Sequence, residues 1–452
     1  MEEFKGKRLF LYNLSTAGWT LLDSIWLTFY VAFLLPPREK VAEGMIAFVS
    51  NERFFGMVTT LGALMIFGRI IDAIADPLVA FWSDRSRSKF GRRRFYLMVG
   101  GIPLAVFTVL IFFPPVASTS FINGIYLAII FGFYFFFFTV YVTPYLALIP
   151  ELGHNEKIRI GITTAQGYFS IIGSAAVMIG GPLLLTYFMR NNNMIGAYRK
   201  MVICLAVPGT LLLYSAVFSV NEKKFSGARP SNISLLDSFK KTINNKPFII
   251  YLFANMSLWF LFNIVRSSAI PIVITLIKAD EAFASTMFIV LFIIAIIFFP
   301  VIGFLTRILK KKTVMMIALG LFALFSFFLS FTGLTVFNPR LWGLVFIGLM
   351  GLPTAILIII PNVILSELCD IDYKKSGERR EAMYFGVQGF FMKLNLGYST
   401  AILALLYSIF GKDISNPLGV RLTLIFSSII ALFGLFIMHH YPEKNIENIL
   451  SE

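Results

Sequence analysis

The sequence predicts an all-α, polytopic membrane protein with twelve transmembrane helices arranged in two six-helix halves. Three observations support this prediction: the composition, the number of long apolar runs, and one long polar interruption near the middle of the chain. Hydrophobic residues make up 58% and charged residues 14% of the 452 residues, and the mean hydropathy is +0.80. Soluble domains are nearer ~45–50% apolar, so this composition indicates a chain that lies mostly in a bilayer.

Each apolar run is long enough for a helix that crosses a hydrocarbon layer of ~30 Å. The twelve runs lie at 10–35, 54–82, 95–115, 121–150, 160–188, 200–220, 247–277, 282–306, 313–334, 341–366, 383–410 and 420–440. The longest interruption, 221–246, is polar and basic. It predicts a cytoplasmic linker between an N-terminal half, 1–220, and a C-terminal half, 247–452.

The net charge of +15 could suggest a nucleic-acid partner, but Lys and Arg occur in short clusters between apolar runs. Such clusters are typical of orientation signals, and we expect no nucleic-acid partner. Most of the 39 Lys and Arg fall in cytoplasmic loops if both termini are cytoplasmic. We therefore expect a multi-pass protein of the cell (plasma or inner) membrane with that orientation. Loops near Arg38, Arg190 and Lys278 are expected outside, and those near Lys89, Lys240 and Lys310 inside.

The second apolar run carries three charged residues, Arg69, Asp72 and Asp76, at spacings of three and four. On a helix they share one face, and they lie near the middle of the bilayer. An ionised carboxylate there costs at least ~2.5 kcal/mol, so it needs an ion, a cavity or a partner charge. Pro77 frees the carbonyl of Ala73 as a further oxygen ligand. The pattern predicts a cation site in a transport path; the alternative is an Arg69–Asp72 ion pair that only holds helices together.

The same stretch continues into a basic turn that contains Asp84, Arg85, Gly91 and Arg92. The whole pattern resembles the major facilitator superfamily and, within it, the glycoside–pentoside–hexuronide:cation symporters, the melibiose carrier group. The resemblance extends over the stretches 139–152 and 369–393 and over the overall length. It implies the major facilitator fold and cation-coupled transport.

Within this family the resemblance assigns the two cation-binding carboxylates to Asp72 and Asp76 and a threonine ligand to Thr139. It places a lysine near the cation and sugar sites at Lys393. The coupling ion would be Na⁺ or H⁺, with Li⁺ as a further candidate, and the three ligands would hold the metal ion if it is Na⁺. No other cofactor is expected.

The sugar-binding positions of the melibiose carriers differ in this sequence. Their two aspartates correspond here to positions near Thr16 and at Val142, an arginine to Gln166, and a tryptophan to Leu146. This sequence therefore contains the coupling residues of the family but lacks its sugar ligands. Galactoside specificity is not expected.

Three more charged residues lie within apolar runs. Arg266, which is followed by two serines, either binds an anionic group of the solute or snorkels toward the outer end of its helix. Lys393 either stands in for a cation and holds the aspartates apart, or forms a structural salt bridge. Asp23 either lines the path near Thr16 or makes a hydrogen bond at a helix end.

Asp84, Arg85, Gly91 and Arg92 predict a cytoplasmic gate whose charges exchange partners during transport. A plain orientation signal would explain the arginines but not Asp84. Acidic partners on the same membrane face are Glu367, Asp370, Asp372, Glu378 and Glu381.

The function expected from the sequence is alternating-access symport of a glycoside, pentoside or hexuronide by a monomer in the lipid bilayer. The absent sugar aspartates and Arg266 favour an anionic solute such as a uronide. The alternative is a Na⁺-dependent lysophospholipid carrier of the same family. An enzyme is not expected, since the sequence has no His cluster, nucleophile elbow or phosphate loop.

Overall fold

The computed structural model describes residues 6–34, 36, 45–49, 53–54, 58–153, 155–222, 234–279, 282–411 and 414–443. Within these ranges the regular secondary structure is helical apart from β1 (Arg53–Phe54) and β2 (Val58–Thr59), which pair antiparallel. The predicted outside loop near Arg38 and the part 223–233 of the predicted linker lie outside the described residues. The all-α prediction is confirmed.

The chain forms two compact units, and each includes one short segment from the other half of the sequence. Unit 1 comprises Met1–His154, Ala165–Leu235 and Arg379–Phe390, and unit 2 comprises Asn155–Thr164, Leu236–Glu378 and Phe391–Glu452. The division into halves at 221–246 remains a prediction.

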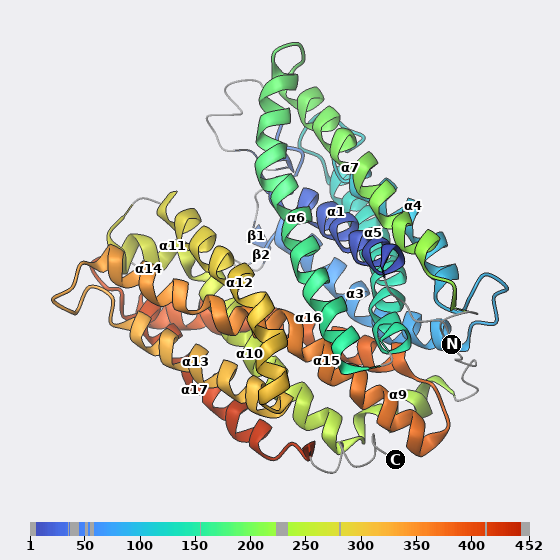
Figure 1. Cartoon of the computed structure of the whole chain (residues 1–452). Coiled ribbons are helices and arrows are strands. Elements are labelled where there is room, and N and C mark those ends of the chain that lie inside the picture. The colour runs from blue at the N-terminus through green and yellow to red at the C-terminus, as the bar shows by residue number, and fades with distance from the viewer. Residues whose placement is uncertain are drawn as a thin grey trace. The chain divides into compact units, whose positions relative to one another are not determined.

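Unit 1 is a bundle in which α1 packs on α7, and α3 and α4 both pack on α5 (Figure 1). Its helices are α1 (Lys7–Leu34), α3 (Thr60–Arg85), α4 (Arg94–Leu110), α5 (Phe121–Leu152), most of α6 (Glu156–Met189) and α7 (Met194–Ser219).

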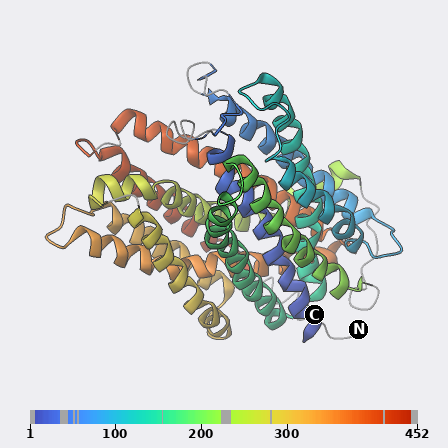
Figure 2. The same cartoon turned by 90° about the horizontal axis from the view of Figure 1, so that it is seen from above.

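Unit 2 is a second bundle, in which α17 packs on α10 and α13, and α15 packs on α12 and α13 (Figure 2). Its helices are α9 (Leu235–Ile243), α10 (Lys246–Ser267), α11 (Ala269–Pro271), the π-helix η1 (Ile272–Ile277), α12 (Ala282–Ile308), α13 (Lys311–Ser330), α14 (Pro339–Leu349), α15 (Gly351–Ser376), most of α16 (Glu381–Phe410) and α17 (Leu418–His439).

Every predicted apolar run coincides with helical structure, but several boundaries differ from the prediction, most clearly in three runs. The second run was expected to begin at 54, whereas α3 begins at Thr60. The run at 247–277 is divided among α10, α11 and η1, and the run at 341–366 is divided between α14 and α15, which continues to Ser376. Hydropathy marks which residues avoid water, whereas backbone hydrogen bonding sets where a helix begins and breaks.

Within the described residues, eight helices are long and apolar enough to cross a membrane, and α4 is a shorter apolar helix. Helix α3 is not among the eight, because Arg69, Asp72 and Asp76 lie in its middle. The charges of the helix that carries the candidate cation ligands therefore need partners within the protein.

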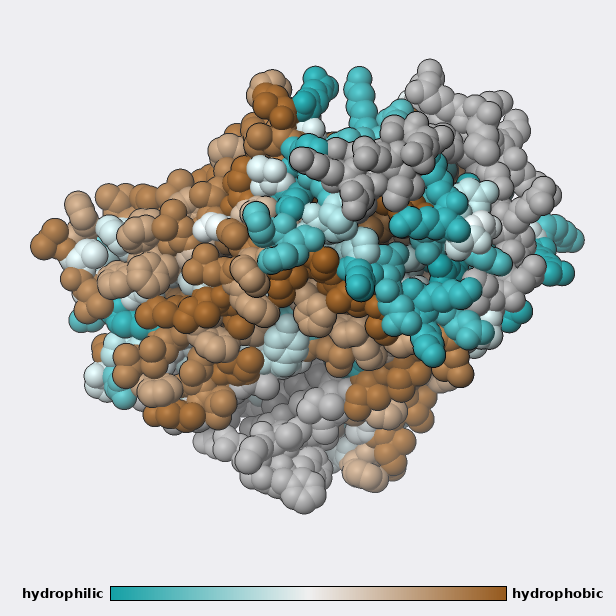
Figure 3. Space-filling model, turned by 90° about the horizontal axis from the view of Figure 1, so that it is seen from below, coloured by the Kyte–Doolittle hydropathy of each residue, from teal (hydrophilic) through white to brown (hydrophobic). Residues whose placement is uncertain are grey.

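Much of the surface is hydrophobic, as the brown regions of Figure 3 show for the face seen from below. Large apolar side chains such as Phe121, Leu211 and Phe218 are largely exposed. A water-soluble monomer rarely exposes apolar area on this scale, whereas lipid tails accept it without penalty. The bundle surfaces are therefore suited to a bilayer.

Close helix packing in unit 1 depends on glycine. A Cβ added to Gly18 of α1 would lie 2.7 Å from the backbone nitrogen of Leu213 and 2.8 Å from the carbonyl oxygen of Gly209, both on α7. Small residues let helix backbones approach closely where lipid provides no hydrophobic driving force for association.

Candidate functional site

Two buried carboxylates of α3 and a hydroxyl of α5 form the candidate cation site in unit 1. The Oγ1 atom of Thr139 lies 3.0 Å from Asp72 Oδ1 and 3.2 Å from Asp76 Oδ1. All three side chains are at most 2% exposed. The four-residue spacing of Asp72 and Asp76 directs both carboxylates to the same face of α3, toward α5. The structure thus brings together the three residues assigned to the cation.

Thr143 is a further polar neighbour of the site that the sequence did not single out. Its hydroxyl donates to Asp76 Oδ1 at 3.4 Å, and its side chain is buried. Thr143 follows Thr139 by four residues, so both hydroxyls face α3. This four-residue spacing from Thr139 could have identified Thr143, which directly precedes Pro144, from the sequence.

Arg69 makes the ion pair that was considered as an alternative to a cation site. Its Nη1 lies 3.3 Å from Asp72 Oδ2, and its guanidinium stacks over the ring of Phe135 at 4.9 Å. The Arg69 side chain is 38% exposed, whereas the Asp72 side chain is 1% exposed. Arg69 contacts Oδ2 of Asp72 and Thr139 contacts Oδ1, so the ion pair and the arrangement of Asp72, Thr139 and Asp76 exist together.

The donor set of this site is suited to a small, hard cation. Carboxylate and hydroxyl oxygens are the ligands that such ions prefer, and the separations allow one ion to contact several oxygens. A proton shared by the two carboxylates is an equally good fit to the same geometry. In the part of the chain that the structure describes, no group of three or more His, Cys, Asp or Glu could hold a metal ion, so a transition-metal site is not indicated there.

Two of the positions that correspond to the family's sugar ligands, Thr16 and Gln166, meet at one tyrosine of α5. The Oη atom of Tyr145 lies 2.8 Å from Thr16 Oγ1 and accepts a hydrogen bond from Gln166 Nε2 at 3.3 Å. Tyr145 also stacks on Tyr12, with ring centroids 4.6 Å apart, and donates to the carbonyl oxygen of Tyr12. The sequence did not identify Tyr12 or Tyr145. These groups are neutral donors and acceptors where melibiose carriers have charged ones.

Asp23 lies in the interior of α1, so the expectation that it makes a hydrogen bond at a helix end is wrong. Its Oδ1 accepts hydrogen bonds from Tyr134 Oη at 2.9 Å and Trp26 Nε1 at 3.1 Å. A carboxylate within a helix takes its donors from neighbouring aromatic side chains, because the backbone N–H groups there are already bonded. Val142, the other predicted substrate position on α5, is buried.

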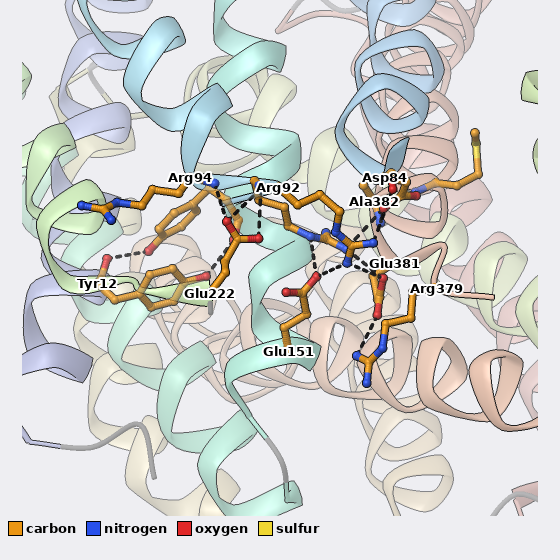
Figure 4. Close-up of polar contacts among 12 residues, drawn as sticks. Tyr12, Asp84, Arg92, Arg94, Glu151, Glu222, Arg379, Glu381 and Ala382 are labelled. Carbon is orange, nitrogen blue, oxygen red and sulfur yellow. Dashed lines mark hydrogen bonds and ion pairs between the residues drawn. The ribbon is translucent and has the colours of Figure 1, made fainter. Parts of the chain in front are cut away.

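The basic loop after α3 contributes two arginines to a buried charge cluster (Figure 4). Arg93 Nε lies 2.6 Å from Glu151 Oε1, and its Nη2 lies 2.8 Å from Glu381 Oε2 and 3.3 Å from Asp84 Oδ1. Arg92 Nη2 lies 2.5 Å from the same oxygen of Glu151. The carboxylate of Glu151 raises the pKa of the Arg92 guanidinium against the opposing effect of burial. We name Asp84, Arg92, Arg93, Glu151 and Glu381 the arginine cluster.

Two carboxylates near this cluster accept hydrogen bonds from the first turns of helices. Asp84 accepts from the backbone N–H of Ala382 at 3.2 Å and of Met383 at 3.1 Å, at the start of α16. Glu222, which follows α7, accepts from the N–H of Arg93 and Arg94 at the start of α4. Both satisfy donors that have no partner within their own helix, and both place a negative charge at a positive helix end.

Gly91, predicted as part of the gate, gives Glu222 room. Its φ of +117° is unfavourable for other residues, and an added Cβ would lie 2.2 Å from Glu222 Oε2. Burial, together with the charge of Glu151, raises the pKa of Glu222, which lies outside the membrane-spanning helices. The sequence did not identify Glu222, because it follows an apolar run in the predicted linker.

Five further predicted residues lie elsewhere. Arg85 is exposed and stacks over the ring of Phe81 at 5.0 Å, outside the arginine cluster. Asp370 pairs with Arg159 in unit 2, and Asp372 is buried on α15. Arg266 is exposed in the last turn of α10. Lys393, which is half-buried on α16, also belongs to unit 2.

Unit 2 has a charge cluster of its own around Lys311 at the start of α13. Lys311 Nζ lies 3.0 Å from Glu156 Oε2 and 3.2 Å from Glu367 Oε1. The Glu156 side chain is 39% exposed, unlike any carboxylate of the arginine cluster. We name Glu156, Lys311 and Glu367 the lysine cluster.

Comparisons with known proteins agree with the fold. A family described as "MFS/sugar transport protein" matches residues 18–442. An uncharacterized symporter of Bacillus subtilis, YnaJ, is 25% identical, with 88% of this chain and 87% of that protein covered. The isoprimeverose transporter of Lactiplantibacillus pentosus is 21% identical over 80% of this chain and 75% of that protein.

Among solved structures, the Escherichia coli fucose:proton symporter FucP has a similar fold. The TM-score is 0.66 at 14% identity, and the match covers 96% of this chain and 97% of that chain. At this identity the similarity supports the fold alone, and it confirms the predicted major facilitator fold.

Proposed function

Because the chain belongs to the MFS/sugar transport protein family, and is thus a membrane transporter rather than an enzyme, we propose that it couples uptake of a sugar-type solute to a monovalent cation. The cation, Na⁺, Li⁺ or H⁺, binds at Asp72, Asp76 and Thr139. The solute is a glycoside, pentoside or hexuronide. One observation carries the proposal: two buried carboxylates of one helix converge on one hydroxyl of another.

Charge explains why the cation would be monovalent. Arg69, Asp72 and Asp76 together carry one net negative charge when both carboxylates are ionised. One proton or alkali ion makes this group neutral, whereas a divalent ion would leave it positive. Net charge in a low-dielectric region is costly, so a monovalent cation is the ligand that relieves the cost. We expect the cation to bind first and to favour the conformation that accepts solute.

Solute recognition in unit 1 would use neutral groups. Thr16, Tyr145 and Gln166 offer hydroxyl and amide groups that hydrogen-bond to sugar hydroxyls. Asp23, beside the indole of Trp26, offers a carboxylate next to an apolar ring. The isoprimeverose transporter named above supports a glycoside as the solute class. Neither the structure nor the named relatives favours the lysophospholipid alternative, and we do not propose it.

The proposal is tested by transport in proteoliposomes with and without imposed Na⁺ and pH gradients, using glycosides, pentoses and uronides as solutes. Asp76→Asn and Asp72→Asn should abolish gradient-driven accumulation, because each removes a charge from the ion site. Asp237→Asn on α9, where the aspartate is exposed, is the matched control and should transport normally. Accumulation at the wild-type level in either ion-site variant would overturn the assignment.

The charge of the solute is tested through Arg266. If the solute is anionic and Arg266 binds it, Arg266→Gln loses a charge-assisted contact of ~1.5–3 kcal/mol, and affinity falls roughly ten- to a hundredfold. Arg307→Gln, which changes another exposed arginine in the last turn of a helix, is the control. Measurement at saturating cation keeps any effect of Lys393 on the aspartates out of the comparison. Unchanged affinity would favour a neutral glycoside.

We also propose that both termini are cytoplasmic and that the protein lies in the cell membrane. The distribution of Lys and Arg among the loops supports this orientation. Single cysteines introduced at Arg190 and Lys278 should react with an impermeant reagent in intact cells, and those at Lys89, Lys240 and Lys310 should not. Labelling of an inside position would contradict the proposed orientation.

A further inference from the structure

The first turns of α16 pack so closely against the candidate cation site that, at two positions, any side chain would clash with it. A Cβ added to Gly389 would lie 2.7 Å from Asp76 Oδ2, 3.2 Å from its Cγ and 3.6 Å from its Oδ1. A Cβ added to Gly386 would lie 2.7 Å from Ala80 Cβ and 2.8 Å from the carbonyl oxygen of Asp76. Separations below 3.0 Å require atoms to move, so these two positions depend on glycine.

The contact between α3 and the start of α16 extends from Asp76 to Asp84. One turn before Gly386, the backbone N–H groups of Ala382 and Met383 donate to Asp84. Asp76 and Asp84 are eight residues apart on α3, and Met383 and Gly389 are six apart on α16, so the two segments run antiparallel. The start of α16 is therefore held to α3 at Asp84 and packed against it at Asp76.

Glycine at positions 386 and 389 lowers the stability of the helix, so we expect a packing reason for it. Within a helix, glycine is less favourable than alanine because its backbone loses more freedom on ordering. A matched position on the same helix shows the difference. A Cβ added to Gly397 would meet no atom of the described residues within 4 Å. Gly389, unlike Gly397, lies directly against the carboxylate of Asp76.

We propose that Gly386 and Gly389 are positioning residues through which occupation of the cation site sets the position of α16. This inference rests on the proposed function. When a cation binds, the carboxylate of Asp76 turns toward Asp72 and Thr139, and the space against Gly389 changes. Because interfaces between packed helices adopt discrete arrangements, a small movement of Asp76 shifts the start of α16, whose remainder belongs to unit 2. A methyl group at 389 displaces the carboxylate from its cation geometry.

The first test compares Gly389→Ala with Gly397→Ala in purified protein. Both replace a helix glycine, so both gain helix propensity. We measure the cation concentration that gives half of the cation-induced rise in melting temperature, with Na⁺, with Li⁺ and at several pH values. We expect Gly389→Ala to need roughly ten- to a hundredfold more cation, and Gly397→Ala to match wild type. A purely structural role would lower the melting temperature of Gly389→Ala but leave that cation concentration unchanged.

The second test needs no cation. In cation-free buffer, Gly389→Ala is combined with Asp76→Ala, which removes the carboxylate that the new methyl group would meet. We expect Gly389→Ala to lower the melting temperature of wild type and to leave that of Asp76→Ala unchanged or higher. If Gly389→Ala alone does not fold but the double variant does, the inference is also supported. Additive effects of the two changes would overturn it.

The outcomes separate this inference from the proposed function. If no cation raises the melting temperature of wild type, the cation site itself is wrong and both fall. If wild type responds to a cation and Gly389→Ala responds identically to Gly397→Ala, the cation site stands and only the role of Gly389 is removed.

Discussion

The arginine cluster of unit 1 and the lysine cluster of unit 2 share one plan. In unit 1 the carboxylate of Glu222, just after α7, accepts hydrogen bonds from the first turn of α4. In unit 2 the carboxylate of Glu443, just after α17, accepts from the N–H of Lys312 in the first turn of α13 at 3.1 Å. Helices α4 and α7 correspond to the third and sixth predicted apolar runs, and α13 and α17 correspond to the ninth and twelfth.

The ion pairs follow the same correspondence. Arg93 joins Glu151, at the end of the fourth run, to Glu381, at the start of the eleventh. Lys311 joins Glu367, at the end of the tenth, to Glu156, at the start of the fifth. Equivalent positions thus hold equivalent charges, as expected of internal repeats.

The difference lies in the cations and in their burial. The arginine cluster has two guanidinium groups, of which Arg92 contacts two carboxylates and the fully buried Arg93 contacts three. The lysine cluster has one ammonium, and its partner Glu156 is partly in contact with solvent. Arginine presents a rigid fork of donors, whereas lysine is a single point charge on a flexible chain. We therefore expect the arginine cluster to stabilise unit 1 more than the lysine cluster stabilises unit 2.

The largest expected effect is that of Glu151→Gln. This change removes one of the two carboxylates that Arg92 and Arg93 both contact, the other being Glu381, and breaking a buried pair costs ~3–5 kcal/mol. The melting temperature in detergent should fall sharply. Arg85→Gln, which alters an exposed arginine next to the same loop, should stay within about 0.5 kcal/mol of wild type. A loss no larger than that of Arg85→Gln would show that the cluster is not a major stabilising element.

A smaller effect is expected from the two capping glutamates, and here the units should agree. Glu222→Ala and Glu443→Ala each remove a carboxylate from a helix start, which costs ~0.5–2 kcal/mol. Thermal unfolding of both variants measures this. Losses that differ by more than twofold between the two would break the proposed equivalence of the caps.

A still smaller effect is expected from Glu156→Gln in the lysine cluster. The Glu156 side chain is 39% exposed, and such pairs contribute ~0.2–1 kcal/mol. Lys311 keeps its contact with Glu367. The loss should shrink further at high salt, because exposed charges are screened. A salt-independent loss as large as that of Glu151→Gln would remove the asymmetry between the clusters.

The smallest effect is the pH dependence that Glu222 confers. Its pKa is raised in the folded protein by burial and by Glu151, while the N–H groups of Arg93 and Arg94 oppose the shift. A raised carboxylate pKa means that the folded state binds the proton more tightly. The stabilising contribution is therefore complete below the unfolded pKa of ~4.3 and is lost as pH rises through the raised value. The melting temperature of wild type relative to Glu222→Gln should fall over that pH range; a constant difference would contradict the shift.

Much of the fold followed from the sequence, because the cost of exposing a helix backbone to lipid fixes both helix content and helix length. The apolar runs coincide with helices for this reason. The position of Asp72, Asp76 and Thr139 also followed, because i, i+4 spacing fixes which side chains share a face and the resemblance identified the partner helix. Thr143 has the same spacing from Thr139 and could have been predicted from it.

Other features could not be predicted, because they depend on which helix lies against which. The run of three arginines before Phe95 does not reveal that Arg92 and Arg93 are buried while Arg94 reaches the carbonyl of Val217. Nor does it reveal that Arg85 lies outside the cluster. Whether an arginine is buried depends on which carboxylates lie near it in the folded chain. These carboxylates can be hundreds of positions away in the sequence, as Glu381 is from Arg92.

The sequence by itself determined the membrane class, the helices and the carboxylate pair of α3, since these depend on local composition and on the period of one helix. Only the tertiary structure decided that Glu222 caps α4, that Tyr145 joins Thr16 to Gln166, and that α16 passes Asp76 at glycine. Each of these is a contact between elements distant in sequence. The free energy of such a contact depends on the distance and burial of both partners, which no local pattern encodes.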